Sequence, residues 1–317
     1  MNFVKNSKSL IQLQAEYELF LKNMQDLIKE VRPRADIAKT KLARYKKQLI
    51  NITDLEEDER RKLIEIVNKL VAINLIFDGE NNLDFNKEDL YKLIEGRFSF
   101  DDKDQKYNDT FLELSMALRF SQSFSEKASI NLKTDCDIIV SDLIAIECKY
   151  LHTKNQIVEH VEYAMKQIDA RIEDQLAKFG MVALDFSNLL DQEELERFAY
   201  CLYDDFSMGY NRLEDNVDDV LKSVLSDGNF ASIISNYITH KVEVEFYDKI
   251  FKSNVLDKMN VNTKAILIQA TTSVSFFNDN QIIPVPMRAM TRLINPKLHK
   301  DEQKIFHSLI NSLATGI

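Results

Sequence analysis

The chain is poor in the residues that break helices, and its cysteines form no recognisable pattern. Its 317 residues include 6 glycines and 4 prolines, a shortage that favours long helices. The 3 cysteines are Cys136, Cys148 and Cys201, and no two of them form a C-x-x-C pair. Neither a zinc site nor a disulfide framework is therefore expected, and a reducing compartment is the simpler interpretation.

Long apolar runs are also missing. One of the most apolar stretches, residues 70–77, is interrupted by Asn74 and is too short to span a bilayer. Residues 1–20 contain no continuous apolar core and no small-residue cleavage site, so no signal peptide is expected. No glycine-rich phosphate loop is present, which argues against a nucleotide cofactor. These absences predict a cytoplasmic protein without membrane contact.

The charge balance is acidic, with 41 lysines and arginines against 51 aspartates and glutamates and a formal net charge of −10. This balance is weak evidence against a protein coated for nucleic-acid binding, although it leaves room for a local basic surface. Hydrophobic residues make up 45% of the chain and charged residues 29%, as in soluble globular proteins. The length predicts one large domain or two ordinary ones.

The first helix is expected at residues 8–31, where apolar side chains alternate at spacings of three and four. This seam consists of Leu10, Leu13, Tyr17, Phe20, Met24, Leu27 and Val31. Pro33 marks the end of the helix. The favoured interpretation is one helix of an intramolecular antiparallel bundle, and the alternative is a coiled coil that pairs with a second copy or another protein.

A strongly basic segment follows at residues 32–47, where Asp36 is the single opposing charge. Its cationic residues are Arg32, Arg34, Lys39, Lys41, Arg44, Lys46 and Lys47. A run of charges usually marks a solvated helix face, and the alternative is a surface that contacts the phosphates of a nucleic acid.

The rest of the first 100 residues is also expected to be helical. An amphipathic helix is predicted at 54–77, with Asp54 as its N-cap and Glu57 completing a capping box. A turn at 77–86 and a short helix at 87–95 follow. Residues 1–100 therefore read as an all-helical N-terminal region.

After residue 100 the pattern changes to mixed helix and strand. Helices are predicted at 106–120, 156–180 and 299–314, a helical insertion at about 190–258, and strands at 128–133, 137–140, 144–150, 181–186 and 265–277, the last as one strand or two. Gly180 is expected to end the second of these helices as its C′ residue. This order predicts an α/β domain over residues 101–317, with a mixed central sheet flanked by helices.

Charged residues interrupt two of the most apolar strands. Because side chains alternate along a strand, Glu147 and Lys149 share one face and lie about 7 Å apart. The other face carries Ile144, Ile146 and Cys148 and is expected to pack in the core. The cysteine side chain therefore points away from Glu147.

Whether Asp137 on the preceding strand lies opposite Glu147 depends on the hairpin loop. With a two-residue loop Asp137 pairs with Ile146 and faces away, whereas a three-residue loop of 141–143 places Asp137 opposite Glu147. Two carboxylates about 5 Å apart repel each other unless a proton or a cation lies between them, and oxygen ligands suit a hard divalent cation. The metal-site interpretation therefore requires the three-residue loop or an equivalent bulge.

Asp137 followed by Glu147-Cys148-Lys149 resembles the D…(D/E)-x-K signature of the PD-(D/E)xK nuclease superfamily, which has the restriction-endonuclease-like fold. The resemblance covers residues 105–186 and extends to 265–277. It implies a Mg²⁺ site, with Mn²⁺ able to substitute, formed by Asp137, Glu147 and the backbone carbonyl of Cys148. It further implies a metal-binding or catalytic role for Glu113 on the preceding helix and a helper role for Gln167 on the following one.

The sequence departs from the superfamily pattern in two places. No proline directly precedes Asp137, and the residue four positions after Gln167 is Arg171 rather than the tyrosine of the RecB-like branch. Arg171 is expected to contact the phosphate backbone. Asp135 remains an alternative ligand to Asp137, and Glu147 and Lys149 remain open to interpretation as an exposed charge pair on a half-buried strand.

The resemblance implies a Mg²⁺-dependent endonuclease that cuts DNA, such as a restriction or phage-defence effector gated by a protein partner. In such an enzyme Lys149 would hold the attacking water or stabilise the charge that develops on the phosphate. One alternative is a catalytically silent nuclease fold kept for binding or assembly. A further alternative is a nuclease directed at RNA, although no RNA-binding motif is present.

Overall fold

The structure is a computed structural model that describes residues 9–77, 83–123, 128–212, 219–278 and 281–315. The N-terminal region contains four α-helices: α1 (Leu10–Val31), α2 (Lys41–Ile50), α3 (Glu57–Ala72) and α4 (Tyr91–Ile94). Short 3₁₀ helices accompany them at Ile37–Lys39, Ile52–Asp54, Asn74–Phe77 and Lys87–Leu90.

The remaining helices belong to the α/β part of the chain. They are α5 (Tyr107–Ser123), α6 (Ile157–Glu173), α7 (Gln192–Asn211), α8 (Val220–Leu225), α9 (Gly228–Phe251), α10 (Val255–Lys258) and α11 (Lys300–Thr315). Two further 3₁₀ helices lie at Lys154–Gln156 and Ser187–Leu189.

A single seven-stranded mixed sheet organises the molecule, with its strands in sequence order. The strands are β1 (Leu83–Asp84), β2 (Ile130–Asn131), β3 (Ile138–Val140), β4 (Ile144–Tyr150), β5 (Phe179–Asp185), β6 (Thr263–Asn278) and β7 (Gln281–Ile294). β2, β3 and β4 are antiparallel neighbours, β5 runs parallel to both β4 and β6, and β6 and β7 form an antiparallel ribbon. The predicted mixed α/β architecture is confirmed.

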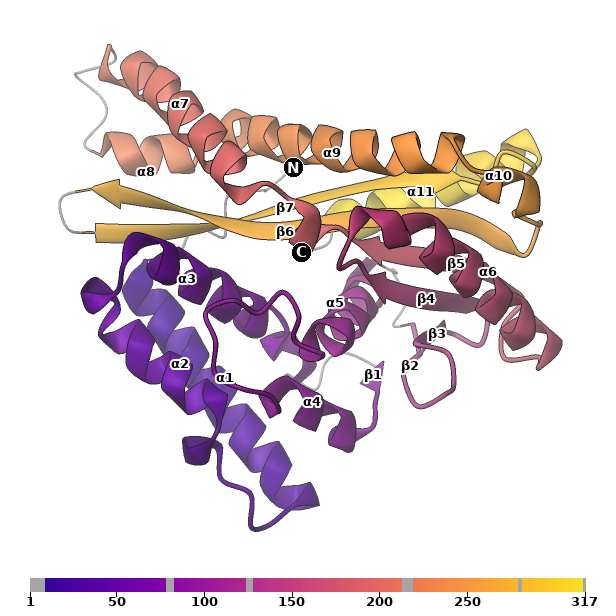
Figure 1. Cartoon of the computed structure of the whole chain (residues 1–317), viewed down its shortest axis with the longest axis horizontal. Coiled ribbons are helices and arrows are strands. Elements are labelled where there is room, and N and C mark those ends of the chain that lie inside the picture. Colours follow the sequence, from indigo (N-terminus) through magenta and orange to yellow (C-terminus); the bar gives the residue numbers. More distant parts are fainter. Residues whose placement is uncertain (1–8, 78–82, 124–127, 213–218, 279–280, 316–317) are drawn as a thin grey trace.

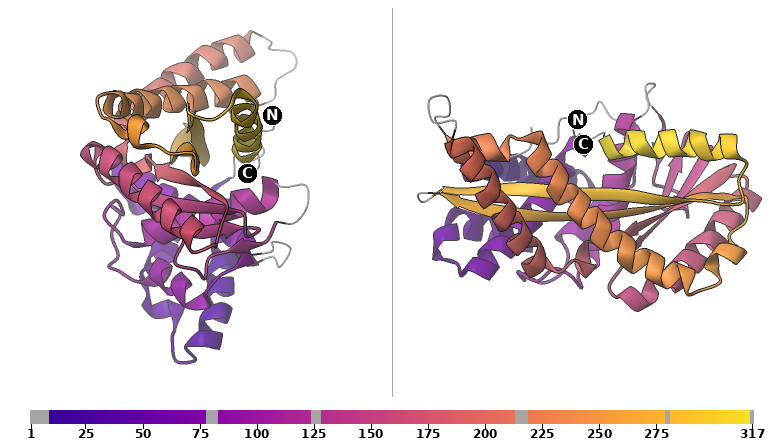
Figure 2. Two further views of the ribbon diagram at one scale, coloured as in Figure 1. Left: turned by 90° about the vertical axis from the view of Figure 1, so that its right-hand side faces the viewer. Right: turned by 90° about the horizontal axis from the view of Figure 1, so that it is seen from above.

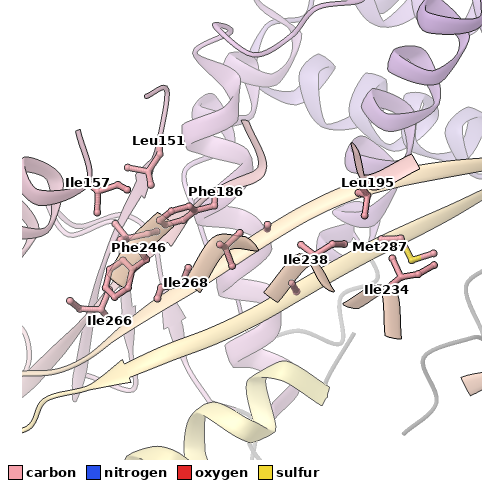
Figure 3. Packing of buried hydrophobic residues seen from close by; sticks show 14 of the residues in the cluster. Leu151, Ile157, Phe186, Leu195, Ile234, Ile238, Phe246, Ile266, Ile268 and Met287 are labelled. Carbon is pink, nitrogen blue, oxygen red and sulfur yellow. The ribbon is translucent and has the colours of Figure 1, made fainter. Parts of the chain in front are cut away.

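Helices cover both faces of the central strands. Ile146 of β4 packs with Met116 of α5 and Ile310 of α11 on one face. On the other face, Ile168 of α6 lies in one hydrophobic cluster with Phe246 of α9 and Ile266 of β6. Figure 3 shows Phe246 beside Ile266. This alternation arises because adjacent residues of a strand point to opposite faces. The strand face predicted to be apolar is therefore part of the core.

The β6–β7 ribbon runs the length of the molecule, with α7–α9 on one side and α1–α3 on the other (Figure 1). Figure 2 shows α9 crossing the ribbon and α11 lying beside it. β7 is the edge strand, and Pro284 and Pro286 remove two backbone donors from it. Further along, Ser235 and Tyr247 of α9 donate hydrogen bonds to backbone carbonyls of β7. These features limit pairing of the edge with another chain.

The seam of α1 packs inside the chain. Its central residues Leu13, Tyr17, Phe20 and Met24 are fully buried, in one hydrophobic cluster with residues of α2, α3 and α5. The favoured intramolecular packing of this helix is therefore observed. Pairing of the N-terminal region with a second copy or another protein stays a prediction.

The predicted start of the third helix is wrong. Asp54 ends a 3₁₀ helix, and α3 begins at Glu57 with Glu56 at the N-cap position and no side-chain cap. The three acidic residues of its first turn instead complement the positive end of the helix dipole. α3 also ends at Ala72, earlier than predicted, and a separate 3₁₀ helix follows.

The predicted role of Gly180 is also wrong. α6 ends at Glu173, Gln175 takes the positive φ of 60° after it, and Gly180 lies within β5. A Cβ atom at Gly180 would lie 2.6 Å from the side chain of Ile168 and 2.9 Å from the carbonyl oxygen of Ala145. Glycine is therefore needed for the close approach of α6 to the sheet and not for a helix end.

Strands account for the remaining differences. The 265–277 segment is one strand within the longer β6, and β7 was not predicted. β1 is a two-residue strand inside the predicted turn at 77–86, of which residues 78–82 lie outside the described residues. Within the described parts of the chain, no helix is both long and apolar enough to cross a bilayer.

Candidate metal and phosphodiester site

The hairpin register satisfies the condition set by the sequence. Val140 pairs with Ile144 and Ile138 pairs with Ile146, so the loop has three residues and the next position brings Asp137 opposite Glu147. Ser141 and Asp142 adopt positive φ values of 50° and 52° to form this loop. Left-handed backbone is costly for residues other than glycine, and aspartate tolerates it better than most.

Asp137 lies just beyond the end of β3 and is bonded to the neighbouring strand. Its Oδ2 accepts a hydrogen bond from the backbone N–H of Cys148 at 2.7 Å. The N–H and C=O of one strand residue point to the same side, so the carbonyl of Cys148 also points toward the β3 side, beyond the last paired residue of β3. The carbonyl is therefore expected on the side of Asp137, and its role as a metal ligand stays a prediction.

Glu147 is fully buried, and neither of its carboxylate oxygens has a hydrogen-bond partner within the described residues. Two cations lie near it: Lys149 Nζ is 3.5 Å from Oε2, and Arg171 Nε is 3.5 Å from Oε1. Lys149 Nζ is also 3.5 Å from Asp137 Oδ2. The interpretation of Glu147 and Lys149 as an exposed charge pair is therefore wrong.

The surroundings of Glu147 and Lys149 shift the pKa values of both side chains. Burial raises the pKa of Glu147 to about 7, and the charge of Asp137 contributes to this rise. Burial alone would lower the pKa of Lys149, but Asp137 and Glu147 outweigh it and raise that pKa above its usual value. Lys149 is therefore a persistent cation, suited to stabilising negative charge and unsuited to acting as a base.

Glu113 lies on α5, on the side of the hairpin opposite to α6. Burial raises the pKa of Glu113 to about 8, and Asp137 is the strongest of the nearby charges that add to this rise. The electrostatic coupling places Glu113 near Asp137. Among the described residues, however, no three His, Cys, Asp or Glu side chains come close enough together to form one ligand group. A metal-binding or catalytic role for Glu113 stays a prediction.

On the other side of the hairpin, α6 contributes Tyr163, Gln167 and Arg171 to the surroundings of the site. The side-chain oxygen of Gln167 is buried without a hydrogen-bond partner. Arg171 contacts Glu147 and donates a hydrogen bond from Nη2 to the backbone carbonyl of Asp135 at 2.6 Å. The side chain of Asp135 is exposed, so Asp137, and not Asp135, is the acid opposite Glu147.

Tyr163, also on α6, was not singled out from the sequence. Its ring centroid lies 5.7 Å from Lys149 Nζ, and the side chain is 58% exposed at the edge of the site. Its position one helical turn before Gln167 is the only signal in the sequence that could have indicated this placement.

The basic segment lies on the N-terminal helices and is not uniformly exposed. Lys41 is 4% exposed, with Nζ 4.1 Å from the centroid of the Tyr107 ring, so it is unsuited to contacting phosphate. Arg32 lies over the Tyr91 ring and Lys46 forms an ion pair with Glu18. The exposed members of the segment are Arg32, Arg34, Lys39, Arg44 and Lys47.

The site thus combines two facing carboxylates, a backbone carbonyl, a persistent lysine cation and an arginine on the covering helix. A scan of protein-family models found no match to the chain, and searches of curated proteins and of solved structures found none either.

Proposed function

We propose that the chain is a Mg²⁺-dependent nuclease that hydrolyses phosphodiester bonds of DNA. The order α5, β2, β3, β4, α6, β5 supports the proposal, because it carries D…E-x-K on adjacent antiparallel strands between two helices, as in the restriction-endonuclease-like fold. The observation that carries the proposal is the register that sets Asp137 opposite Glu147.

The residues present fit a hard divalent cation. Glu147 offers two buried oxygens without hydrogen-bond donors, which is costly for a carboxylate unless a charge partner satisfies it. Asp137 and the carbonyl of Cys148 would supply the other protein oxygens. All of these are oxygen ligands, the type that Mg²⁺ and Mn²⁺ prefer.

When bound, the cation would neutralise charge on the phosphate and lower the pKa of a bound water. The charge of Lys149 would stabilise the negative charge that develops on the transferring phosphate. Arg171, 3.5 Å from Glu147, would hold that carboxylate in place and present its remaining donors to a phosphate oxygen. Glu113, with a pKa of about 8, holds a proton at neutral pH and would lose it to join a metal site.

One observation favours the alternative of a catalytically silent fold. The two carboxylates of Asp137 and Glu147 are matched by the cations of Lys149 and Arg171, so the four charges balance without a metal. A buried balanced cluster of this kind can serve structure alone. Metal binding therefore separates the two functions.

The test measures cleavage of plasmid, linear duplex and single-stranded DNA by the purified chain, with Mg²⁺, Mn²⁺ or EDTA. We expect metal-dependent cutting that falls by at least a hundredfold in Lys149→Ala, because one charge on the transition state is lost. Lys166→Ala, at an exposed position of α6, is the matched control and should cut like the wild type. An RNA of the same sequence tests the alternative substrate.

A chain that requires a protein partner would not cut alone, so metal affinity is measured as well. Calorimetric titration with Mn²⁺ should show saturable binding to the wild type and at least tenfold weaker binding to Glu147→Gln. Glu193→Gln, at an exposed site on α7, should bind like the wild type. Equal affinity of the wild type and Glu147→Gln would exclude this metal site and leave the silent fold.

A further inference from the structure

A cavity lies away from the hairpin site, where α3 and α5 meet the β6–β7 ribbon. It has a volume of about 90 Å³, enough for several water molecules. Its walls are formed by Glu65, Asn68, Lys69, Ala72, Phe111, Thr271, Thr272, Pro286, Met287 and Arg288. Three charged side chains, the cations Lys69 and Arg288 and the acid Glu65, lie among these residues.

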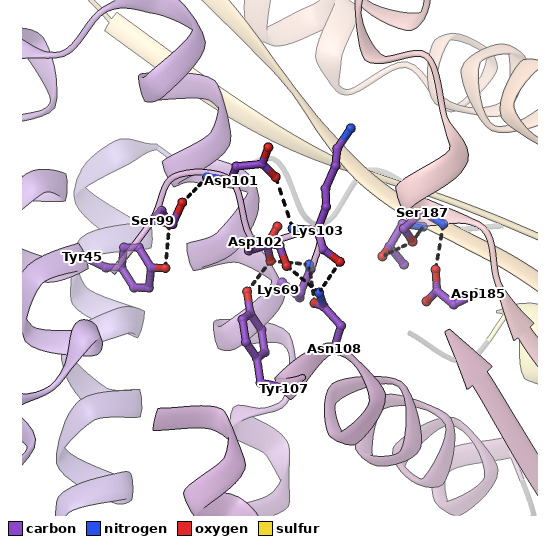
Figure 4. A network of polar contacts seen from close by, with 11 residues as sticks. Tyr45, Lys69, Ser99, Asp101, Asp102, Lys103, Tyr107, Asn108, Asp185 and Ser187 are labelled. Carbon is purple, nitrogen blue, oxygen red and sulfur yellow. Dashed lines mark hydrogen bonds and ion pairs between the residues drawn. The ribbon is translucent and has the colours of Figure 1, made fainter. Parts of the chain in front are cut away.

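The hydroxyl and amide groups of the wall are already engaged within the protein. Thr272 donates a hydrogen bond to Gln192 at 2.6 Å, and Asn68 donates to Ser273 at 3.1 Å. Lys69 forms an ion pair with Asp102 at 2.7 Å and belongs to a buried network (Figure 4). Its charge is therefore balanced before any ligand is considered.

Arg288 is different, because no ion pair balances its charge within the described residues. Its Nη1 is buried without a hydrogen-bond partner, and no ion pair involves this residue within the described chain. Burial lowers the pKa of Arg288 to about 10, which leaves a full positive charge at neutral pH. Arg288 is only partly buried, but a cationic N–H that is buried without an acceptor is costly, so the site favours an anionic ligand.

A second guanidinium adds to this charge. Arg119 of α5 is 2% exposed, its Nε has no hydrogen-bond partner among the described residues, and its Nη1 lies 3.5 Å from the sulfur of Met290. After burial itself, the charge of Arg288 is the strongest influence that lowers the pKa of Arg119, so the two groups lie near each other. Two neighbouring guanidinium groups strengthen the attraction for an oxyanion.

Glu65 restricts which anions the cavity can bind. This carboxyl lines the same cavity, so an anion without a proton would face a like charge. Hydrogen phosphate and phosphate monoesters carry acceptor oxygens for the arginine and one proton that a carboxyl group can share. Sulfate has the same shape and no proton at neutral pH.

We propose that this cavity binds a protonated phosphate, either inorganic phosphate or the terminal phosphate of a nucleotide, through Arg288, with Glu65 sharing its proton. The site is separate from the carboxylates of the hairpin, and the proposal does not depend on nuclease activity. Arg119 does not line the cavity, but its guanidinium adds positive charge near Arg288.

The test is calorimetric titration of the full chain in a phosphate-free buffer, with inorganic phosphate and with sulfate at equal ionic strength. We expect saturable binding of one phosphate, with sulfate at least tenfold weaker. Arg288→Gln should weaken phosphate binding at least tenfold, and Glu65→Gln should reduce the preference over sulfate. Arg197→Gln, at an exposed arginine of α7, should bind phosphate like the wild type.

A thymidine dinucleotide with and without a 5′-phosphate distinguishes the two sources. Binding of the phosphorylated dinucleotide alone assigns the site to a nucleotide phosphate, whereas equal binding of inorganic phosphate assigns it to the free ion. Absence of saturable binding of either, or wild-type affinity in a folded Arg288→Gln, would overturn the proposal. If that variant does not fold, Ala72→Leu provides a second test, because it narrows the cavity without a change of charge. Wild-type phosphate affinity in Ala72→Leu would also overturn the proposal.

Discussion

The carboxylate of Asp137 accepts a hydrogen bond from the backbone N–H of Cys148 at 2.7 Å, across the hairpin that carries the candidate site. β3 begins at Ile138, directly after Asp137, so the side chain of Asp137 takes the place of the next backbone partner of β4. Asp137 therefore has a structural task in addition to its proposed task as a metal ligand, and substitutions can separate the two.

Asp137→Asn should retain the fold and lose the metal. The amide oxygen still accepts the bond from Cys148, so the free energy of unfolding should change by less than about 1 kcal/mol. Asp137→Ala removes the acceptor and should cost about 1 kcal/mol more. Urea unfolding measures both values, and Mn²⁺ titration should show at least tenfold weaker binding in each. Wild-type metal affinity in Asp137→Asn would contradict the proposed role.

The hairpin loop should be sensitive to side-chain shape at Asp142. At a φ of 52°, a β-branched residue is strained, so Asp142→Val should lower the free energy of unfolding by about 1–2 kcal/mol. Asp142→Gly should stay within about 1 kcal/mol of the wild type, because glycine adopts this backbone freely. The exposed Asp135, whose φ is not positive, provides the control, and Asp135→Val should have little effect in the same urea measurement.

The sequence was informative wherever the chemistry was local. Strict alternation along β4 fixed which residues face the core, and it separated Glu147 and Lys149 from Cys148 correctly. The choice between two and three loop residues could not be made, because the positive φ values that form the loop fall on Ser141 and Asp142 rather than on glycine. The loop therefore carried no turn signal in the sequence.

Long-range packing set the limits of the remaining predictions. Gly180 resembles a helix end in sequence, and only the approach of Ile168 to Ala145 reveals its role. β7 contains Pro284 and Pro286, which argue against a strand unless it lies at an edge, as it does here. The burial of Lys41 beneath Tyr107 and the contact of Arg171 with Glu147 likewise depend on elements that are distant in sequence.

Arg171→Gln should make the protein less stable without metal and more responsive to metal. The change removes a cation 3.5 Å from a buried carboxylate, and Lys149 alone remains to offset it, so a loss of about 1–3 kcal/mol is expected. A divalent cation would then replace the lost charge. Thermal unfolding with EDTA and with Mg²⁺ should show a larger metal-induced rise in Tm for Arg171→Gln than for the wild type or Arg197→Gln. An equal rise in all three proteins would contradict the prediction.

Gly180→Ala should push α6 away from the sheet. The added Cβ would meet Ile168 at 2.6 Å and the backbone of Ala145 at 2.9 Å, and overpacking of this kind costs about 1–3 kcal/mol. In an Ile168→Ala background the same substitution should cost less, because one of the two contacts is removed. Gly209→Ala on α7, where nothing lies within 4 Å, should instead stabilise the chain by about 0.5–1 kcal/mol in the same chemical unfolding measurement.

The burial of Lys41 predicts how the free energy of unfolding depends on pH. Its Nζ is buried next to the face of the Tyr107 ring, and no described residue forms a hydrogen bond with it. Burial lowers the pKa of Lys41 from 10.5 to about 8, although Asp102 and Glu95 oppose the change and Lys69 adds to it. The unfolded chain therefore binds more protons than the folded chain between these two pH values, and stability from this group rises with pH across that window.

Lys41→Met should consequently be more stable than the wild type at pH 7, by up to about 3 kcal/mol, because the charged amine no longer has to be buried. The difference should shrink as the pH rises from about 8 toward 10.5, since the wild-type amine is then neutral in the folded protein. Urea unfolding across this range measures the difference, and subtraction removes the titration of tyrosines that both proteins share. Lys47→Met, at an exposed position of the same helix, should show no such trend. A constant difference between wild type and Lys41→Met at every pH would mean that folding does not lower the pKa of Lys41, which would contradict the prediction.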